Sequence, residues 1–485
     1  MKEVKNKIAP LIDISVLNED QKKAFIELRD YICDKNNDDI YVLKGWAGTG
    51  KTFCVSLLVR YVLEVIYPNK NFHKIAVTGP TNKSVRVIKK STGIKNPRVI
   101  FQTVHKLLGL TEVITNDGKQ EFINKGDFRA GIESTRLLII DEVSMLSDDL
   151  FHNIIKYRNK TKIICMGDPA QIPPVGRPDC IPFREDMLKS YGIKTLELKT
   201  IMRQKQDNPI INASILIRED LEKPGNHVEP ITKLNENGDG IEFLNLNSKE
   251  TKVNFTNILD SYFNSPKFKE DPEYAKIIAW RNKTVSTMNS LARKIIHGND
   301  AETSKLLMGE KLIANNPIIE GTDILFNTND EFIVESFEIK TERIKGNSYN
   351  IGRNEIAVDD TLLKYYETKV SYLNEDDKRI IYYIDILHED SEEDFYRISN
   401  LLKQVAIEKK GKDKTWIKYY TFIRRFADVN YAYAITAHKA QGSTYTASFV
   451  LEDDIEVNID VIERNRIKYT AYTRTSKKLY VLKRF

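Results

Sequence analysis

The stretch Gly45-Trp-Ala-Gly-Thr-Gly-Lys51-Thr52 follows an apolar run at residues 40–44 and opens a helix-like segment at residues 52–65. This is the G-x-x-x-x-G-K-T pattern in the strand-to-helix setting that a phosphate-binding loop requires. Gly45, Gly48 and Gly50 let successive backbone N–H groups turn inward towards phosphate oxygens, and the helix N-terminus adds partial positive charge. Lys51 is expected to reach the β- and γ-phosphates and Thr52 to coordinate Mg²⁺, so the sequence predicts a site for ATP and Mg²⁺.

Aliphatic runs alternate with helix-like segments along the first half of the chain, at residues 75–79, 137–140 and 163–166. Near-continuous apolar strands separated by helices indicate a parallel sheet that is buried on both faces. The same pattern returns at residues 277–280, 431–436, 448–451 and 479–482, which predicts a second α/β unit. Between the two units, residues 311–315 and 331–341 are expected to be strands of a small β module.

Two carboxylates stand at the end of one predicted strand, in Leu137-Leu-Ile-Ile-Asp141-Glu142. Because ligands bind at the carboxyl ends of parallel strands, both are expected beside the phosphate-binding loop. Asp141 is placed to hold Mg²⁺ through water, and Glu142 is placed to take a proton from the attacking water. Gln171 ends the segment Gly167-Asp-Pro-Ala-Gln171 after the next strand, where its amide can contact the γ-phosphate or orient water.

Two arginines are candidates for completing the chemistry. Arg203 lies just beyond the first predicted unit, and Arg474 lies close to the C-terminal end. A planar guanidinium can stabilise charge on a transferred phosphoryl group, an effect worth about 10³–10⁵ in rate. If both arginines reach the same nucleotide, the two units must close around it, and hydrolysis can then produce motion.

The ordered motifs resemble those of superfamily 1 helicases, and more narrowly the RecD/Dda branch that includes the Dda helicases of T-even bacteriophages. The wording of residues 141–145 (Asp-Glu-Val-Ser-Met) and 436–442 (Thr-Ala-His-Lys-Ala-Gln-Gly) carries much of the likeness, which spans residues 17–482 and is loosest at 311–430. The motifs in chain order are Gln21, the phosphate-binding loop, Thr78-Gly-Pro-Thr81, Thr103-Val-His105, Asp141-Glu142, residues 167–171, Arg203-Gln204, Asn282-Lys-Thr-Val, residues 436–443 and residues 472–474.

The resemblance implies an α/β fold of two RecA-like parallel-sheet P-loop domains, with an inserted small SH3-like β module and a β-hairpin pin. The first RecA-like domain is expected at residues 1–199, with the hairpin inserted at about 110–126. The second is expected at residues 200–310 together with 431–485. Residues 311–430 would form the SH3-like module with a helical extension.

The resemblance also implies ATP-driven 5′-to-3′ translocation on single-stranded DNA and separation of duplex DNA. Carried over by position, Gln21 would contact adenine, Gln171 would couple the γ-phosphate to the DNA groove, and Arg203 and Arg474 would be arginine fingers. Hydroxyls, amides and a lysine suit phosphate contacts, and a histidine can stack on a base, so these contacts need not select a sequence. The expected DNA contacts are Pro80, Thr81, Thr103 and His105 on the first domain, and Asn282, Lys283, Thr436 and His438 on the second.

Strand-like residues at 111–122 flank Asn116-Asp117-Gly118, which is a strong hairpin signal. In the family such a hairpin is the pin that splits the duplex, at a cost of about 1.4 kcal/mol per base-pair step that ATP must supply. Phe122 is the candidate stacking residue of this strand-separation pin, and packing of Phe122 onto the domain is an equal alternative. Trp416, Tyr419 and Tyr420 lie among basic residues of the β module, where packing is favoured over DNA contact.

The composition fits a globular protein of 485 residues with a net charge of +5, which permits a basic channel without demonstrating nucleic-acid binding. Four scattered cysteines without a C-x-x-C pair argue against a zinc site or a disulfide framework and for a reducing cytoplasm. No stretch resembles a signal peptide or the ~20 apolar residues of a membrane span. The expected partners are single-stranded DNA, duplex junctions, and single-strand-binding and replication proteins. A monomer is expected, in bacterial or phage-infected cytoplasm, acting in DNA replication, repair or recombination.

Three other functions stay open. A translocase stimulated by single strands that remodels protein–nucleic-acid complexes without processive unwinding would use the same motor residues. A P-loop ATPase or switch that binds no nucleic acid is disfavoured by the second α/β unit, Arg474 and residues 436–443. A helicase of opposite polarity is disfavoured by the wording of residues 141–145 and 436–442, and no further carboxylate cluster in the sequence suggests an added nuclease.

Overall fold

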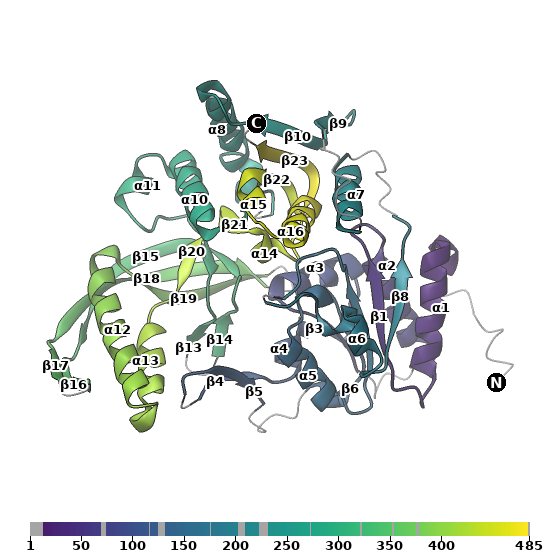
Figure 1. Ribbon diagram of the computed structural model, residues 1–485, viewed down its shortest axis with the longest axis horizontal. Helices are drawn as coiled ribbons and strands as arrows, with labels where there is room; N and C mark the ends of the chain where they lie inside the picture. The colour runs from purple at the N-terminus through teal and green to yellow at the C-terminus, as the bar shows by residue number, and fades with distance from the viewer. Residues whose placement is uncertain are drawn as a thin grey trace.

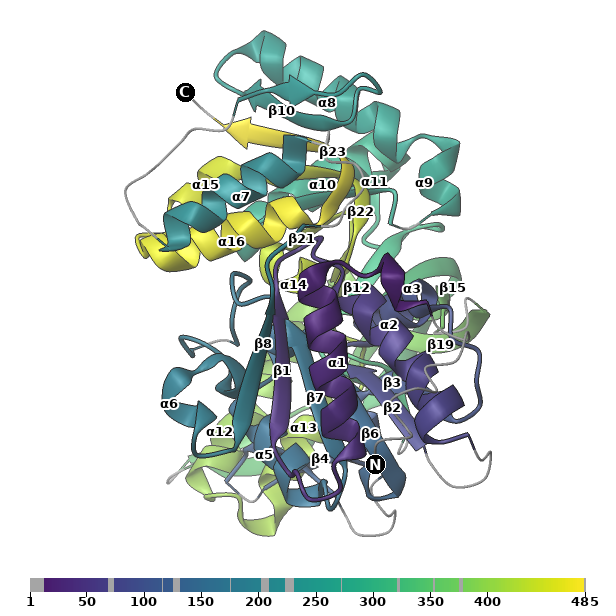
Figure 2. The same ribbon diagram turned by 90° about the vertical axis from the view of Figure 1, so that its right-hand side faces the viewer.

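The computed structural model describes residues 13–68, 74–115, 117–124, 131–174, 176–201, 209–222, 231–271, 273–320, 323–351, 354–374 and 378–483. These residues form two six-stranded sheets, one five-stranded sheet and three two-stranded sheets. In Figures 1 and 2 the second six-stranded sheet and its helices lie above the first, and Figure 1 shows the five-stranded sheet to the left of the first and below part of the second. We call these three parts the first unit, the second unit and the β module.

The sheet of the first unit is parallel throughout, in the order β3-β2-β6-β7-β1-β8. Its strands are β1 (Ile40–Gly45), β2 (Lys74–Gly79), β3 (Val99–Thr103), β6 (Thr135–Ile140), β7 (Lys162–Gly167) and β8 (Ile193–Leu198). Tyr41 and Leu43 pack against helices on one face, whereas Ile40 and Val42 pack against helices on the other. Burial of both faces explains why the strands consist of uninterrupted apolar residues, and the four strands predicted from such runs are confirmed.

Helices cover both faces of this sheet. The predicted helix at residues 52–65 is α2 (Lys51–Tyr61), continued by the π-helical turn η3 (Val62–Ile66). Together with α1 (Glu19–Cys33) it covers one face, and α5 (Asp148–Tyr157) covers the other. The remaining helical segments are η2 (Ile14–Val16), α3 (Asn82–Thr92), α4 (Val104–Leu107), η4 (Gly131–Ser134), η5 (Val143–Met145), η6 (Ile181–Phe183) and α6 (Glu185–Leu188).

The sheet of the second unit has the order β21-β11-β22-β23-β10-β9, parallel except for the pair β10–β9. Its strands are β9 (Lys233–Leu234), β10 (Gly240–Asn245), β11 (Ala275–Ala279), β21 (Ala434–Thr436), β22 (Tyr445–Leu451) and β23 (Thr475–Lys483). Its helices are α7 (Pro209–Glu222), α8 (Lys249–Phe263), α9 (Pro266–Glu270), α10 (Asn282–His297), α11 (Asp300–Thr303), α14 (Ala437–Ala440), α15 (Glu452–Glu456) and α16 (Val461–Thr473). Two helix-covered sheets, parallel except for the edge pair β10–β9, confirm the predicted pair of RecA-like α/β units.

The prediction of one strand at residues 431–436 was wrong. Tyr431 ends β20 (Val429–Tyr431), which pairs antiparallel with β12 of the β module, whereas β21 begins at Ala434 in the second unit. The apolar run is continuous because Ala432 and Tyr433 are also buried as the chain passes from one sheet to the other. An unbroken hydrophobic pattern therefore hides the point at which the chain leaves the β module.

The β module is built on an antiparallel sheet in the order β19-β18-β15-β12-β20. Its other strands are β12 (Lys311–Ala314), β15 (Glu331–Ile344), β18 (Thr361–Leu373) and β19 (Arg379–Leu387), with the hairpins β13 (Ile318–Glu320)–β14 (Asp323–Phe326) and β16 (Asn347–Ile351)–β17 (Asn354–Val358). The turn η7 (Glu389–Ser391), the helix α12 (Glu392–Glu408), the turn η8 (Lys412–Lys414) and the helix α13 (Thr415–Ile423) follow. The strands predicted at 311–315 and 331–341 are confirmed, and the SH3-like character of the module stays a prediction.

The predicted hairpin in the first unit is present as β4 (Thr111–Ile114) and β5 (Gln120–Ile123), which pair antiparallel. Gly118 takes a positive φ of 84° in the turn, a conformation that glycine adopts without strain.

Across the part of the chain that the structure describes, no helix has the length and hydropathy to cross a membrane.

Candidate nucleotide site and nucleic-acid track

The phosphate-binding loop joins β1 to α2. Gly48 and Gly50 have φ values of 87° and 77°, so both positions require a residue that tolerates the left-handed region. A Cβ on Gly45 would lie 2.6 Å from Thr49 Oγ1, so the start of the loop is closely packed. The Lys51 ammonium donates to the carbonyl oxygens of Gly45 and Trp46, which folds its side chain back over the loop. The loop is therefore shaped around the end of the Lys51 side chain.

Gln21, on α1, is hydrogen-bonded to this loop. Its side chain is fully buried, and its amide Nε2 donates to the Thr49 carbonyl at 2.9 Å. Its Oε1 accepts the N–H of Asn18, which also caps α1. Both ends of the amide are thus bonded to the protein, so a contact between Gln21 and adenine stays a prediction.

Asp141 and Glu142 follow β6, beside the loop. The Asp141 N–H donates to the Thr78 carbonyl, and its Oδ1 accepts the Glu142 N–H at 2.9 Å. Burial and the neighbouring Glu142 carboxylate raise the pKa of Asp141 to about 7, which a bound cation would reverse. Glu142 has a φ of 52°, a left-handed conformation that costs a non-glycine residue energy and is concentrated at functional sites.

Gln171 belongs to the first unit and Arg474 to the second. Gln171 is 5% exposed, and among the described residues its Oε1 is buried without a hydrogen-bond partner. Arg474 follows α16 and is also 5% exposed, with its Nη1 4.0 Å from Glu142 Oε1. Its guanidinium is held by the carbonyls of Thr470 and Ser443. Arg203, the second predicted arginine finger, lies outside the described residues.

The residues present fit a magnesium nucleotide. The unsatisfied Gln171 Oε1 and the raised pKa of Asp141 both mark polar groups that a bound ligand and cation would satisfy. The described residues contain no cluster of three His, Cys, Asp or Glu side chains that would hold a metal alone. Thr52, at the start of α2, and Asp141 are the residues that would hold Mg²⁺, together with phosphate oxygens of the nucleotide.

The threonines expected to contact DNA share one structural role. Thr81 follows β2, and Thr103 and Thr436 end β3 and β21. Each accepts a backbone N–H at the start of α3, α4 or α14. Helix capping accounts for a threonine or serine at these positions without a ligand. The structure places them at the carboxyl ends of the strands, and their contact with DNA stays a prediction.

The other residues of the predicted DNA track differ in exposure. Pro80 is half-buried, whereas Asn282 and Lys283 are exposed at the start of α10. His438 lies half-buried on α14, where burial lowers its pKa. Asp454, which the sequence did not single out, holds the turn before Asn282 by accepting bonds from the Trp280 and Arg281 N–H groups and from Thr284.

His105 and Phe122 contact each other. Their ring centroids are 5.1 Å apart in an edge-on arrangement, and Phe122 remains 40% exposed. Burial lowers the pKa of His105, which keeps this ring neutral near pH 7. The ring of Phe122 therefore joins the base of the hairpin to the predicted DNA track while keeping an exposed edge.

The hairpin also touches the β module through α13. The Arg424 guanidinium lies 2.8 Å from Glu112 Oε1, and the Tyr420 hydroxyl donates to the Gly118 carbonyl at 3.0 Å. A Cβ on Gly118 would lie 2.6 Å from the Trp416 ring, so the turn lies flat on this indole. Two of the aromatic residues considered for DNA contact, Trp416 and Tyr420, thus pack against the hairpin.

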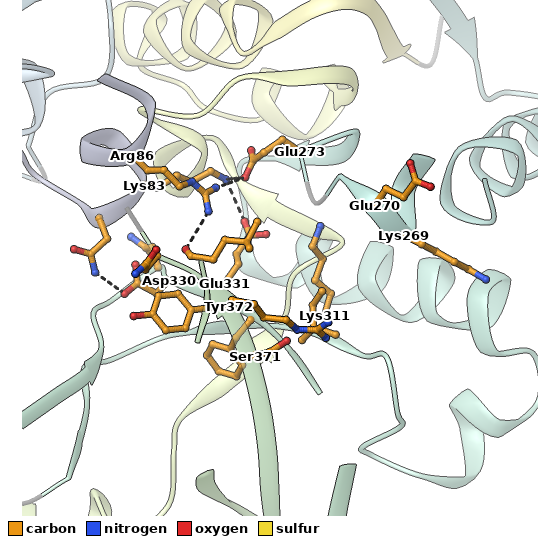
Figure 3. Close-up of a pocket in the computed structure, with 17 residues that line it drawn as sticks. Lys83, Arg86, Lys269, Glu270, Glu273, Lys311, Asp330, Glu331, Ser371 and Tyr372 are labelled. Carbon is orange, nitrogen blue, oxygen red and sulfur yellow. Dashed lines mark hydrogen bonds and ion pairs between the residues drawn. The ribbon is translucent and has the colours of Figure 1, made fainter. Parts of the chain in front are cut away.

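A half-buried cluster of ion pairs connects all three parts of the molecule. The Lys83 ammonium, on the first turn of α3, is 3.0 Å from Glu273 of the second unit and 3.5 Å from Glu331 of the β module (Figure 3). Lys276 on β11 contacts the other oxygen of Glu331 at 2.9 Å. A cavity of about 230 Å³ beside this cluster is lined from all three parts. A lysine in a helix gives no sequence signal of such a role.

Two family profiles match the chain. One, described as an AAA domain, matches residues 16–239, and one, described as a UvrD-like helicase C-terminal domain, matches residues 431–482. An uncharacterised protein of Acanthamoeba polyphaga mimivirus is 28% identical over 520 residues, which cover 96% of this chain and 99% of that protein. The ATP-dependent DNA helicase Dda of Enterobacteria phage T4 is 24% identical over 474 residues, covering 94% of this chain and 97% of that protein.

Among solved structures, the Pif1 helicase from Bacteroides in complex with ADP-AlF3 and ssDNA is 16% identical, with a TM-score of 0.44 over 96% of this chain and 92% of that chain. The first profile covers the phosphate-binding loop, Asp141 and Glu142, and the second covers Arg474. The likeness to Dda extends over nearly the whole of both chains. The two profiles and the likeness to Dda together support a superfamily 1 helicase of the Dda kind.

Proposed function

We propose that this chain is an ATP-dependent DNA helicase that moves 5′ to 3′ along single-stranded DNA and separates duplex DNA at a junction. The observation that carries the proposal is the 4.0 Å approach of Arg474, from the second unit, to Glu142 of the first. A nucleotide bound at the loop would be enclosed by both units, so its hydrolysis would change how they sit together. The relative named ATP-dependent DNA helicase supports the same activity.

In the proposed reaction Lys51 binds the phosphates, and Thr52 and Asp141 hold Mg²⁺, which supplies charge stabilisation when it is bound. Glu142 takes the proton of the attacking water. Arg474, with Arg203 as the second finger, stabilises the charge on the transferred phosphoryl group, and Gln171 contacts the γ-phosphate. Gln21 contacts adenine.

The proposed DNA track runs over Pro80, Thr81, Thr103 and His105 and continues over Asn282, Lys283, Thr436 and His438. The hairpin acts as the separation pin, and Phe122 is its stacking residue. Contact of the hairpin with α13 favours duplex separation over remodelling without unwinding, because a braced wedge resists displacement better than a free one. The 5′-to-3′ direction rests on the wording of residues 141–145 and 436–442.

The proposal includes domain boundaries at residues 199/200 and 310/311 and a monomeric state. The third boundary, expected at 430/431, lies after Tyr431 instead, because Tyr431 ends β20 of the β module. Contact with single-strand-binding and replication proteins, and a bacterial or phage-infected cytoplasm, stay predictions. The named relatives come from phage T4 and a mimivirus, which does not single out one kind of host.

The proposed activity is tested by ATP hydrolysis with and without single-stranded DNA, and with RNA of the same sequence. Stimulation by DNA is expected for the wild type, and Lys51→Ala and Glu142→Gln should abolish turnover, while Glu142→Gln should still bind ATP. Lys23→Ala, an exposed lysine on α1, is the matched control and should hydrolyse ATP normally. Full hydrolysis by Glu142→Gln would remove Glu142 as the base, and stimulation by RNA alone would overturn the DNA assignment.

A further inference from the structure

Tyr469 belongs to α16 of the second unit, yet its hydroxyl is bonded to two groups of the first unit. The phenol O–H donates to Asp168 Oδ2 at 2.6 Å, and its oxygen accepts the Ala47 N–H at 3.2 Å. Tyr469 and Asp168 are 2% and 0% exposed. Burial and the Asp168 carboxylate raise the pKa of Tyr469 well above its usual value, so the hydroxyl keeps the proton that it donates.

The Ala47 N–H belongs to the phosphate-binding loop, two residues after Gly45. Backbone N–H groups of such a loop are the donors that phosphate oxygens use. The preceding residue, Trp46, also contacts the second unit, because the Arg218 guanidinium of α7 lies 3.7 Å from the centre of its ring. Two consecutive residues of the loop are therefore held by side chains of the second unit.

The Asp168 end of the link controls the turn that carries Gln171. Asp168 Oδ1 accepts the Ala170 N–H, and the Asp168 carbonyl accepts the Gln171 N–H. The next residue, Ile172, donates its N–H to Thr470 and accepts a bond from the Gln441 amide, both in the second unit. A change in the hydrogen bonds of the Tyr469 hydroxyl would therefore shift the backbone that positions Gln171.

We infer that Tyr469 is a positioning residue for nucleotide turnover. Its hydroxyl competes with a phosphate oxygen for the Ala47 N–H. Through its bond to Asp168, the hydroxyl makes the position of the Asp168–Gln171 turn depend on whether the loop holds a phosphate. A phosphate oxygen that takes the Ala47 N–H releases the hydroxyl from the loop but leaves it bonded to Asp168. The position of the second unit would then depend on nucleotide binding through the hydrogen bond between Tyr469 and Ala47. This role rests on the proposed ATPase function.

The test is Tyr469→Phe, which removes the hydroxyl and keeps the ring. Equilibrium binding of a hydrolysis-resistant ATP analogue is expected to tighten roughly five-fold, because one competing hydrogen bond is lost. DNA-stimulated kcat is expected to fall about ten-fold, because the Gln171 turn loses its link to the loop. Tighter binding together with slower turnover is a split that a merely structural role would not produce.

Tyr472→Phe is the matched control. Tyr472 lies on the same helix, is also buried, and donates to a buried carboxylate at the same distance of 2.6 Å, but its acceptor, Glu452, lies within the second unit. Thermal unfolding should show similar losses of stability in the two variants, with unchanged analogue affinity in Tyr472→Phe. Identical analogue binding by Tyr469→Phe, Tyr472→Phe and wild type would overturn the role of Tyr469, and so would weaker binding by Tyr469→Phe alone.

If Tyr469→Phe does not fold, Asp168→Asn takes its place, because it weakens the anchor of the same hydroxyl. The affinity of Asp168→Asn for the analogue should also increase, and an unchanged affinity would overturn the inference.

Failure of the proposed function would give a different result from failure of this inference. A wild-type protein that binds the analogue but does not hydrolyse ATP would remove the motor, whereas the binding comparison would still decide the role of Tyr469.

Discussion

Arg474 Nη1 of the second unit lies 4.0 Å from Glu142 Oε1 of the first, although 332 positions separate them along the chain (474 − 142). The Arg474 guanidinium is held by the carbonyls of Thr470 and Ser443, and the Glu142 backbone takes a left-handed conformation after the end of β6. The catalytic base and the arginine finger of the proposed reaction thus meet at the surface where the two units join. Any change in how the units sit must alter this distance, which is how hydrolysis and movement would be linked.

Arg474→Ala should lower the kcat of DNA-stimulated ATP hydrolysis by about 10³ or more, because the guanidinium stabilises charge that develops only in the transition state. Analogue binding should change little. Arg464→Ala is the matched control, since Arg464 lies on the same helix and pairs with Glu456 within the second unit. A loss of analogue affinity as large as the loss of kcat would contradict a transition-state role.

Lys83→Met should destabilise the protein by about 1–3 kcal/mol, because two partly buried carboxylates each lose one of their two cations. Glu273 keeps Arg86 at 3.5 Å, and Glu331 keeps Lys276 at 2.9 Å. Denaturant unfolding measures the effect. Lys90→Met, an exposed lysine on the same helix, should stay within about 0.5 kcal/mol of wild type. Equal stabilities for the two variants would show that the cluster of ion pairs contributes nothing.

Arg424→Glu should slow duplex unwinding while leaving DNA-stimulated ATP hydrolysis intact. The new carboxylate would repel Glu112, which now lies 2.8 Å from Arg424, and the hairpin would lose its support on α13. The double variant Glu112→Arg/Arg424→Glu restores opposite charges and should recover unwinding, with a coupling energy of about 0.5–3 kcal/mol. Normal unwinding by Arg424→Glu would mean that the hairpin needs no brace.

Lys311 should make stability rise with pH. Burial and the nearby Lys276 lower its pKa to about 7, although Glu331 and Glu273 oppose the shift, and Lys83 lies in the same cluster. Between pH 7 and the ordinary value of 10.5, the unfolded chain holds a proton that the folded protein has lost, so the free energy of unfolding increases with pH in this window. The cost of burying the charged form is fully present below pH 7.

Lys311→Met should remove this rise and stabilise the protein at pH 7 by about 1–3 kcal/mol, as apolar replacement of buried charges often does. Unfolding curves at several pH values between 7 and 10 provide the measurement. Lys345→Met, an exposed lysine of the same module, should leave the slope of wild type unchanged. A slope in Lys311→Met equal to that of wild type would assign the pH dependence to other groups.

The strands, the loop and the positions of the polar residues at the strand ends could be predicted because their signals are local. The apolar run at 137–140 and the glycines of the loop report their own conformation wherever the rest of the chain goes. Contacts between units carry no such signal. Nothing near Tyr469 says that its hydroxyl reaches Ala47, and nothing near Lys83 says that it joins three parts of the molecule. The apolar run at 431–436 misled for the same reason, because it belongs to two sheets.

The central claim is tested most directly by strand separation on two duplexes, one with a 5′ single-stranded tail and one with a 3′ tail, in the presence of ATP and Mg²⁺. Glu142→Gln serves as the inactive control. Unwinding of only the 5′-tailed duplex, and only by the wild type, is the predicted result. Unwinding of only the 3′-tailed duplex would contradict the direction. DNA-stimulated ATP hydrolysis without unwinding of either duplex would contradict strand separation and leave a remodelling translocase.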